Sequence, residues 1–142
     1  MAAYVKFLEA SGARVVPLIL GEPEEVMMEK LSKLNGVLFP GGDGDYTDYG
    51  LKIINKLMEY NDQGLVYPAW GTCLGYETMM IWASSVGTKD IWDSYVVHDI
   101  SLPLKFVVDP TKTAMFGDLG KDSYIFEKEG MTLNSHNWGV DP

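Results

Sequence analysis

The stretch Tyr67-Pro-Ala-Trp-Gly-Thr-Cys-Leu-Gly-Tyr-Glu77 decides the fold of this chain. It begins with apolar residues of strand length, passes through a turn with two glycines, and leads into a segment rich in Met and aromatic residues that predicts a largely buried helix over residues 76–86. A strand, a tight glycine turn and a helix in this order are typical of a nucleophile elbow. The stretch therefore predicts an α/β fold with Cys73 at the carboxyl end of a strand, where open α/β sheets bind their ligands.

The segments before this stretch alternate between strand and helix patterns. Strands are expected at residues 13–20, 36–39 and 65–70, and helices at residues 2–10, 22–34 and 49–60. Pro17 confines the first of these strands to an edge, a bulge or its own end, because proline has no N–H to donate. Since alternating strands and helices imply right-handed crossovers, the order predicts a doubly wound, mostly parallel sheet flanked by helices.

The pattern after Gly87 is less regular. Strands are expected at residues 95–97 and 100–108, and a loop or short helix at residues 112–120. The chain ends without a closing helix, so its last element is expected to be cut short. The length of 142 residues corresponds to one domain, residues 1–142.

Charge and hydropathy exclude several classes of partner. Eleven Lys and Arg residues stand against 20 Asp and Glu residues, giving a net charge of −9, and no basic run occurs. Nucleic acids and anionic membrane surfaces are therefore not expected partners. No apolar stretch approaches the roughly 20 residues of a membrane span, and Lys6 and Glu9 come too early for a signal peptide.

Cys73 is the one cysteine, so it cannot form an internal disulfide. At the start of a helix the positive end of the helix dipole favours the thiolate, which is the nucleophilic form. The other interpretation is a buried structural cysteine, because free cysteines are among the most buried residues. The flanking glycines favour the nucleophile.

A second glycine turn, Pro40-Gly41-Gly42, directly follows an expected strand and is placed at the same end of the sheet. Glycine lets backbone N–H groups turn inward, so one N–H of this turn, together with the N–H of Leu74, is a candidate donor of an oxyanion hole for acyl transfer. The glycine pair by itself is better explained as an ordinary β-turn, and only its combination with the Cys73 turn favours acyl chemistry.

Charged side chains and histidines complete the candidate site. Glu77, four residues after Cys73, is expected at the mouth of the site; it would bind a substrate amine or serve only as a first-turn carboxylate. A cysteine nucleophile needs a base. Of the two histidines, His136 is the better candidate, and His98 is expected on a strand as a surface or packing residue. The acidic loop at residues 43–48 lacks the glycine and glutamate of a calcium-binding EF-hand, so no metal is expected.

With these residues in place, the chain resembles the γ-glutamyl hydrolases, members of the class I glutamine amidotransferase-like superfamily with a flavodoxin-like sheet. The resemblance covers almost the entire sequence. It is carried by Ala2-Ala-Tyr-Val-Lys-Phe-Leu-Glu-Ala-Ser-Gly-Ala-Arg-Val-Val-Pro17, Asn35-Gly-Val-Leu-Phe-Pro-Gly-Gly42, Tyr67-Pro-Ala-Trp-Gly-Thr-Cys-Leu-Gly-Tyr-Glu77, Leu102-Pro-Leu104 and His136-Asn-Trp138. The most specific stretches are the strand entry from Tyr67 to Cys73 and the opening from Tyr4 to Glu9.

The resemblance implies a cysteine-type omega peptidase that hydrolyses folylpoly-γ-glutamates or antifolate polyglutamates through a Cys73 thioester, without metal or cofactor. It implies that Gly42 and Leu74 donate to the oxyanion, and that Glu77, His136 and Gly41 meet substrate. The base in this family is a histidine in a Trp-His-Pro-Glu segment near the C-terminus, which does not occur here. The usual strand before the first helix is also absent, so the chain is expected to be a fragment that is inactive alone.

Two other functions remain open. The chain could be the glutaminase domain of an amidotransferase, which would act on free glutamine, or a catalytically dead protein that binds γ-glutamyl ligands. The resemblance further implies a lysosomal, vacuolar or extracellular setting and is compatible with a homodimer.

Overall fold

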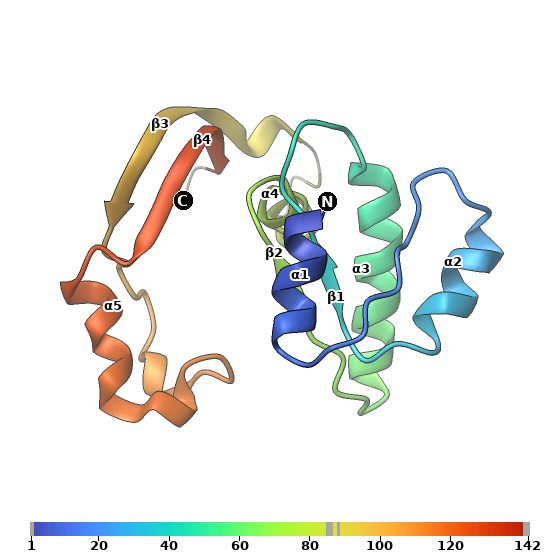
Figure 1. Cartoon of the computed structure of the whole chain (residues 1–142), viewed down its shortest axis with the longest axis horizontal. Coiled ribbons are helices and arrows are strands. Elements are labelled where there is room, and N and C mark those ends of the chain that lie inside the picture. The colour runs from blue at the N-terminus through green and yellow to red at the C-terminus, as the bar shows by residue number, and fades with distance from the viewer. Residues whose placement is uncertain (1, 85–86, 88, 141–142) are drawn as a thin grey trace. The chain divides into compact units, whose positions relative to one another are not determined.

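The computed structural model describes residues 2–84, 87 and 89–140 (Figure 1). The chain divides into two compact units: the first runs to Trp92 and includes the last residues from Val140, and the second comprises Asp93–Gly139. The single domain expected over residues 1–142 stays a prediction. No helix in the described ranges combines the length and the hydrophobicity that a bilayer crossing requires.

The first unit contains the elements expected around Cys73. Its elements are α1 (Ala2–Ala10), α2 (Glu24–Leu31), β1 (Val37–Phe39), α3 (Thr47–Asp62), β2 (Ala69–Gly71), α4 (Leu74–Ala83) and the short 3-10 helix η1 (Lys89–Ile91). The helix expected to reach Val86 is described to Ala83, and Val86 itself lies outside the described residues. Pro23 immediately precedes α2, and Glu24 and Glu25 occupy its first turn, where carboxylates interact favourably with the helix dipole.

β1 and β2 are parallel, as the alternation of strands and helices predicts (Figure 1). Val37 pairs with Ala69, and Phe39 pairs with Gly71. The pairing continues one residue further, because the N–H of Thr72 donates to the carbonyl of Phe39 at 3.1 Å. The glycine turns that follow the two strands therefore lie at the same end of this sheet.

A hydrophobic core between α2, α3 and the strands holds the first unit together. The buried residues of this core are Met27, Leu31, Phe39, Ile53, Ile54, Leu57 and Tyr67. The hydroxyl of Tyr67 donates to the carbonyl of Leu31 at 2.9 Å. The side chain of Asn61 bonds both to the N–H and to the carbonyl of Tyr67, at 3.0 Å each, and so fixes the chain as it enters β2.

The strand expected at residues 13–20 does not form, and the predicted doubly wound, mostly parallel sheet is confirmed only as a mixed α/β structure with the parallel pair β1 and β2. The described strands form two sheets of two strands each, β1 with β2 and β3 with β4, and neither sheet includes residues 13–20. Pro17 offers no N–H, and a strand is stable only when its backbone groups find partners. Side chains satisfy part of this backbone instead: Glu22 accepts from the N–H of Ile19, and Lys30 donates to the carbonyl of Pro17, both at 3.1 Å.

The second unit is built on β3 (Trp92–Leu102) and β4 (Thr132–Val140), which pair and run in opposite directions (Figure 1). The two strands expected at residues 95–97 and 100–108 are one strand that ends before Pro103, and β4 was not expected. Between them lie η2 (Pro110–Lys112), η3 (Gly117–Tyr124) and α5 (Ile125–Lys128), so the expected loop or short helix at residues 112–120 is largely 3-10 helix.

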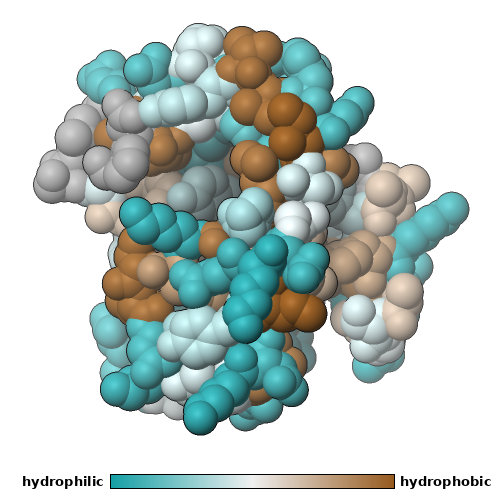
Figure 2. Space-filling model, turned by 90° about the vertical axis from the view of Figure 1, so that its left-hand side faces the viewer, coloured by the Kyte–Doolittle hydropathy of each residue, from teal (hydrophilic) through white to brown (hydrophobic). Residues whose placement is uncertain are grey.

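Four aromatic rings, three of them at or within these short helices, form a cluster in the second unit. Phe116 lies 5.2 Å from Phe106 and 5.4 Å from Phe126, measured between ring centroids, and Tyr124 packs edge-on against Phe106. Elsewhere the surface is mixed, and on the face drawn in Figure 2 hydrophobic patches interrupt a largely hydrophilic surface.

Candidate active site

Cys73 occupies the turn between β2 and α4, at the N-cap position of the helix. Its φ of 53° and ψ of −117° lie in a region that residues other than glycine rarely adopt, at a cost of about 1–3 kcal/mol. The residue is exposed, so it is not the buried packing cysteine of the alternative interpretation. The turn thus presents the thiol to solvent at the carboxyl end of a strand, and the role of nucleophile stays a prediction.

Gly71 and Gly75, one on each side of Cys73, make this turn possible. A Cβ at Gly75 would stand 2.1 Å from the carbonyl oxygen of Phe39, and a Cβ at Gly71 would stand 2.7 Å from the backbone of Gly75. Both distances are far below van der Waals contact. The first turn of α4 therefore lies directly against β1 and β2, which the glycine spacing predicts.

The second glycine turn lies beside Cys73. A Cβ built on Gly41 would stand 2.8 Å from the Cβ of Cys73 and 2.8 Å from the hydroxyl of Tyr4. Gly42 has a φ of 132°, and a Cβ there would meet no atom within 4 Å. The structure therefore brings Gly41 to the cysteine, whereas the oxyanion contacts of Gly42 and Leu74 stay predictions.

Two tyrosines that the sequence did not single out fix this glycine turn. The N–H of Gly41 donates to the hydroxyl of Tyr4 at 2.9 Å, and the hydroxyl of Tyr46 donates to the carbonyl of Pro40 at 2.6 Å. Burial raises the pKa of Tyr46 well above its ordinary value, and the nearby Tyr4 and Cys73 add to the shift. Tyr46 therefore remains a neutral donor. Tyr4 was visible in the sequence only as part of an apolar helix face.

Glu77 lies on α4 one turn after Cys73, and its N–H donates to the carbonyl of Cys73 at 3.0 Å. The residue is only 7% exposed, which is unusual for a carboxylate, and it contributes to the raised pKa of Tyr46. Leu74 is also buried. Glu77 is thus not a solvated surface residue, and its contact with substrate stays a prediction.

His136 lies on β4 and His98 on β3, so both histidines belong to the second unit. The Nδ1 atom of His136 is buried without a hydrogen-bond partner among the described residues. A buried ring nitrogen without a partner is costly unless a ligand or another segment satisfies it. Its place in the active site beside Cys73 stays a prediction.

Within the described residues, no group of three or more His, Cys, Asp or Glu side chains could hold a metal ion. In the acidic loop the carboxylate of Asp45 accepts from the N–H of Thr47 at 3.1 Å, a local turn contact that shapes the start of α3. The described site consists of an exposed thiol beside the Gly41 turn. Acyl transfer by such a thiol also requires N–H donors directed at the oxyanion, and these stay predictions.

Comparison with known proteins identifies close relatives. Gamma-glutamyl hydrolase 2 of Arabidopsis thaliana is 40% identical over 148 residues, covering 99% of this chain and 42% of the relative. Gamma-glutamyl hydrolase 1 of Arabidopsis thaliana is 36% identical over 155 residues (99% and 41%), and the Rattus norvegicus gamma-glutamyl hydrolase is 33% identical over 145 residues (98% and 45%). No family model matches the chain. The chain spans less than half the length of these curated relatives.

Proposed function

Because the chain is homologous to the γ-glutamyl hydrolases over the part of their length that it spans, we propose that it carries the nucleophile of such an enzyme. The proposed substrates are folylpoly-γ-glutamates or antifolate polyglutamates, and the bond cleaved is the γ-amide between glutamates. The observation that best supports this proposal is the exposed Cys73 at the start of α4, held at a positive φ next to Gly41.

In the proposed reaction, the Cys73 thiolate attacks the carbonyl carbon of the γ-amide. The carbonyl oxygen gains negative charge, and the N–H groups of Leu74 and Gly42 donate to it. The tetrahedral intermediate collapses as the C–N bond breaks, the amine leaves with the proton that the Cys73 thiol lost, and the acyl group remains on Cys73 as a thioester. Water then attacks the thioester, the C–S bond breaks, the γ-carboxylic acid is released, and a proton from the water regenerates the thiol. No metal or cofactor takes part in this chemistry.

Substrate binding is assigned to Glu77, His136 and Gly41. The buried carboxylate of Glu77 lies one turn from Cys73 and is proposed to accept a hydrogen bond from the α-amino group that the leaving glutamate acquires when the γ-amide is cleaved. Gly41 is proposed as a substrate contact because it lies against Cys73, so closely that any side chain would collide with the cysteine and with Tyr4. We further propose the complete class I glutamine amidotransferase-like sheet, and a lysosomal, vacuolar or extracellular setting, for a protein of the relatives' full length.

General-base assistance distinguishes the chain from a complete enzyme. A base contributes typically about 10²–10⁴-fold to the rate, and the Trp-His-Pro-Glu segment expected to supply it does not occur in this sequence. The 142 residues are therefore proposed to be inactive alone.

The test is to fuse the chain to the C-terminal part of the Arabidopsis thaliana γ-glutamyl hydrolase 2 and to measure glutamate release from a γ-glutamyl peptide. The fusion should release glutamate at least about 10²-fold faster than the chain alone. Cys73→Ala in the fusion should abolish release. Comparable turnover by the short chain would contradict the missing base and assign that role to His136.

The same assay separates the two alternatives. Cleavage of free glutamine in preference to γ-glutamyl chains would indicate a glutaminase domain. Tight binding of a polyglutamate with no release of glutamate, unchanged by Cys73→Ala, would indicate a binding protein without catalysis.

A further inference from the structure

Both polar groups of the peptide that joins Pro40 to Gly41 are bonded to tyrosine hydroxyls. The carbonyl of Pro40 accepts from Tyr46 at 2.6 Å, and the N–H of Gly41 donates to Tyr4 at 2.9 Å. This peptide is trans, so it is planar, and its C=O and N–H point to opposite sides. The two tyrosines therefore hold one peptide plane from opposite sides, and the plane cannot rotate without breaking both bonds.

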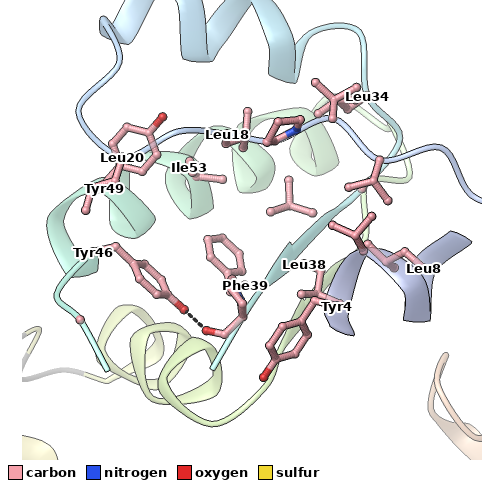
Figure 3. Close-up of a pocket in the computed structure, with 18 of the residues that line it drawn as sticks. Tyr4, Leu8, Leu18, Leu20, Leu34, Leu38, Phe39, Tyr46, Tyr49 and Ile53 are labelled. Carbon is pink, nitrogen blue, oxygen red and sulfur yellow. Dashed lines mark hydrogen bonds between the residues drawn. The ribbon is translucent and has the colours of Figure 1, made fainter. Parts of the chain in front are cut away.

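The two tyrosines reach this peptide from different helices. Tyr4 lies in α1, and Tyr46 is the N-cap residue of α3. Figure 3 shows the two rings on opposite sides of β1, with the bond from Tyr46 drawn as a dashed line. The carbonyl of Tyr46 accepts from the N–H of Gly50 at 2.7 Å, so the first turn of α3 holds this tyrosine in place. The active-site turn is thus tied to two helices.

The two adjacent glycines make these bonds necessary. Glycine adopts positive and negative φ about equally well, so sterics alone do not select one orientation of the peptide between Pro40 and Gly41. A Cβ at Gly42 would meet no atom within 4 Å, so no neighbouring group packs against that side of the turn. The hydrogen bonds of Tyr4 and Tyr46 are therefore the contacts that fix this peptide.

The bond to Tyr4 also decides which N–H of the turn is available to an oxyanion. The N–H of Gly41 is donated to Tyr4, and a backbone amide has one proton to give. In the part of the chain that the structure describes, the N–H of Gly42 donates to no protein atom. Oxyanion donors are effective because they are held in place before the charge develops. A fixed peptide before Gly41 restricts the direction of the next N–H, which is that of Gly42.

We propose that Tyr4 and Tyr46 are positioning residues for acyl transfer at Cys73: they lock the Pro40–Gly41 peptide so that Gly42, and not Gly41, presents its N–H to the oxyanion. The inference rests on the proposed function, because it concerns the same thioester chemistry. Each tyrosine acts through the turn and not through contact with the substrate. The lock itself is a property of the fold and is tested separately from the chemistry.

The first test measures amide hydrogen exchange by NMR in the 142-residue chain. Tyr46→Phe removes a hydroxyl that does not bond to the N–H of Gly41. Exchange at Gly41 should nevertheless accelerate at least about tenfold, because the released peptide plane rotates away from Tyr4. Tyr4→Phe should accelerate the same exchange directly, by removing the acceptor. Exchange at Leu57 in the core reports global unfolding and separates it from this local opening.

Tyr49→Phe is the matched control for Tyr46→Phe. Tyr49 lies three residues after Tyr46 and is likewise partly buried, but its hydroxyl donates to Glu22 at 3.0 Å and not to the turn. This variant should leave exchange at Gly41 unchanged. Equal acceleration in the Tyr46 and Tyr49 variants, or no acceleration in Tyr46→Phe, would overturn the lock.

The second test measures glutamate release by the fusion to the C-terminal part of the Arabidopsis thaliana γ-glutamyl hydrolase 2. Because the oxyanion forms only as the reaction proceeds, Tyr46→Phe should lower kcat and kcat/KM equally, by at least about tenfold, and leave KM unchanged. Tyr49→Phe should change neither constant. A Tyr46→Phe variant that alters KM alone would contradict a role in positioning the oxyanion donor.

Tyr4→Phe distinguishes the two candidate donors of the turn. This substitution frees the N–H of Gly41, so kcat would rise if Gly41 donated to the oxyanion. The lock predicts that kcat falls at least about tenfold instead, because the Gly42 N–H loses its fixed direction. A rise would overturn the assignment of Gly42. If the unmodified fusion releases no glutamate, the proposed function fails together with the catalytic role of the tyrosines, whereas exchange at Gly41 still confirms or rejects the lock.

Discussion

The backbone of Cys73, the proposed nucleophile, is strained. An L residue at its φ of 53° and ψ of −117° is strained, whereas glycine adopts positive φ freely. The turn keeps this conformation because close backbone contacts at Gly71 and Gly75 hold the chain on both sides of Cys73. Strain of this kind persists where the surrounding structure enforces it, often at active sites.

Cys73→Gly should therefore raise the free energy of unfolding of the first unit by about 1 kcal/mol, the strain relieved less the flexibility gained by the unfolded chain. Chemical unfolding followed by circular dichroism measures this change. Cys73→Ala keeps the Cβ and should differ from the unmodified chain by less than about 0.5 kcal/mol. A stabilisation by alanine equal to that by glycine would show that the thiol, and not the backbone, causes the strain.

Glu22 is a second residue whose environment makes a testable prediction. A side-chain hydrogen bond from Lys30 lowers the pKa of Glu22 from 4.5, and the N–H of Ile19 and the hydroxyl of Tyr49 donate to the same carboxylate. A carboxylate with a lowered pKa stabilises the folded state above its unfolded pKa, and this contribution is lost as the pH falls through the folded pKa.

Glu22→Gln should accordingly reduce stability near neutral pH, and the difference from the unmodified chain should shrink as the pH falls below about 4.5. Urea unfolding at a series of pH values measures it. Glu29→Gln is the control, because in the part of the chain that the structure describes Glu29 pairs with Lys33, and both side chains are about two thirds exposed. Its effect should be smaller, since exposed ion pairs contribute little. A pH-independent difference for Glu22→Gln would argue against the charged hydrogen bonds.

At the scale of elements, the position of α4 depends on Gly75, because a residue with no side chain lets the helix approach β1. Gly75 lies in the first turn of α4, and its Cα faces the carbonyl of Phe39 at the end of β1. Backbone at that point cannot move without breaking the pairing of β1 with β2. The approach of the helix to the sheet, and with it the position of Cys73, depends on this contact.

Gly75→Ala should destabilise the first unit by about 3 kcal/mol, because an added Cβ would overlap the backbone of β1. Gly50→Ala is a matched control in α3. There the nearest atom, at 2.9 Å, is the methyl group of Thr78, and alanine gains about 1 kcal/mol of helix propensity. Its net cost should be about 1 kcal/mol or less. Thermal unfolding measures the loss of stability in both variants. An equal loss in Gly75→Ala and Gly50→Ala would mean that α4 can shift away from β1 to accommodate the added Cβ.

At the scale of the whole molecule, the chain contains two separate hydrophobic clusters. Leu57 belongs to the core of the first unit and is 2% exposed. Phe116 belongs to the aromatic cluster of the second unit. Because no buried residue of the first core belongs to the second unit, the two clusters are expected to stabilise different parts of the chain.

Leu57→Ala should cost about 2–5 kcal/mol and accelerate amide exchange within the first unit alone. Phe116→Ala should accelerate exchange only within Asp93–Gly139. The neighbouring Met58, which is 38% exposed, provides the control, and Met58→Ala should change exchange little. Hydrogen exchange followed by mass spectrometry measures all three. Loss of protection in both units from either substitution would show that they fold as one cooperative domain.

The sequence by itself determined the features that depend on short-range pattern. Helical periodicity located α1 and α3, and the glycine spacing around Cys73 predicted the turn that exposes it. Only the tertiary structure decided features that need a distant partner. Residues 13–20 have the composition of a strand but pair with no strand of the described residues, and Tyr4 and Tyr46 reach the Gly41 turn from other elements. Periodicity reports which face of a segment is apolar, whereas pairing and burial depend on what the rest of the chain places against it.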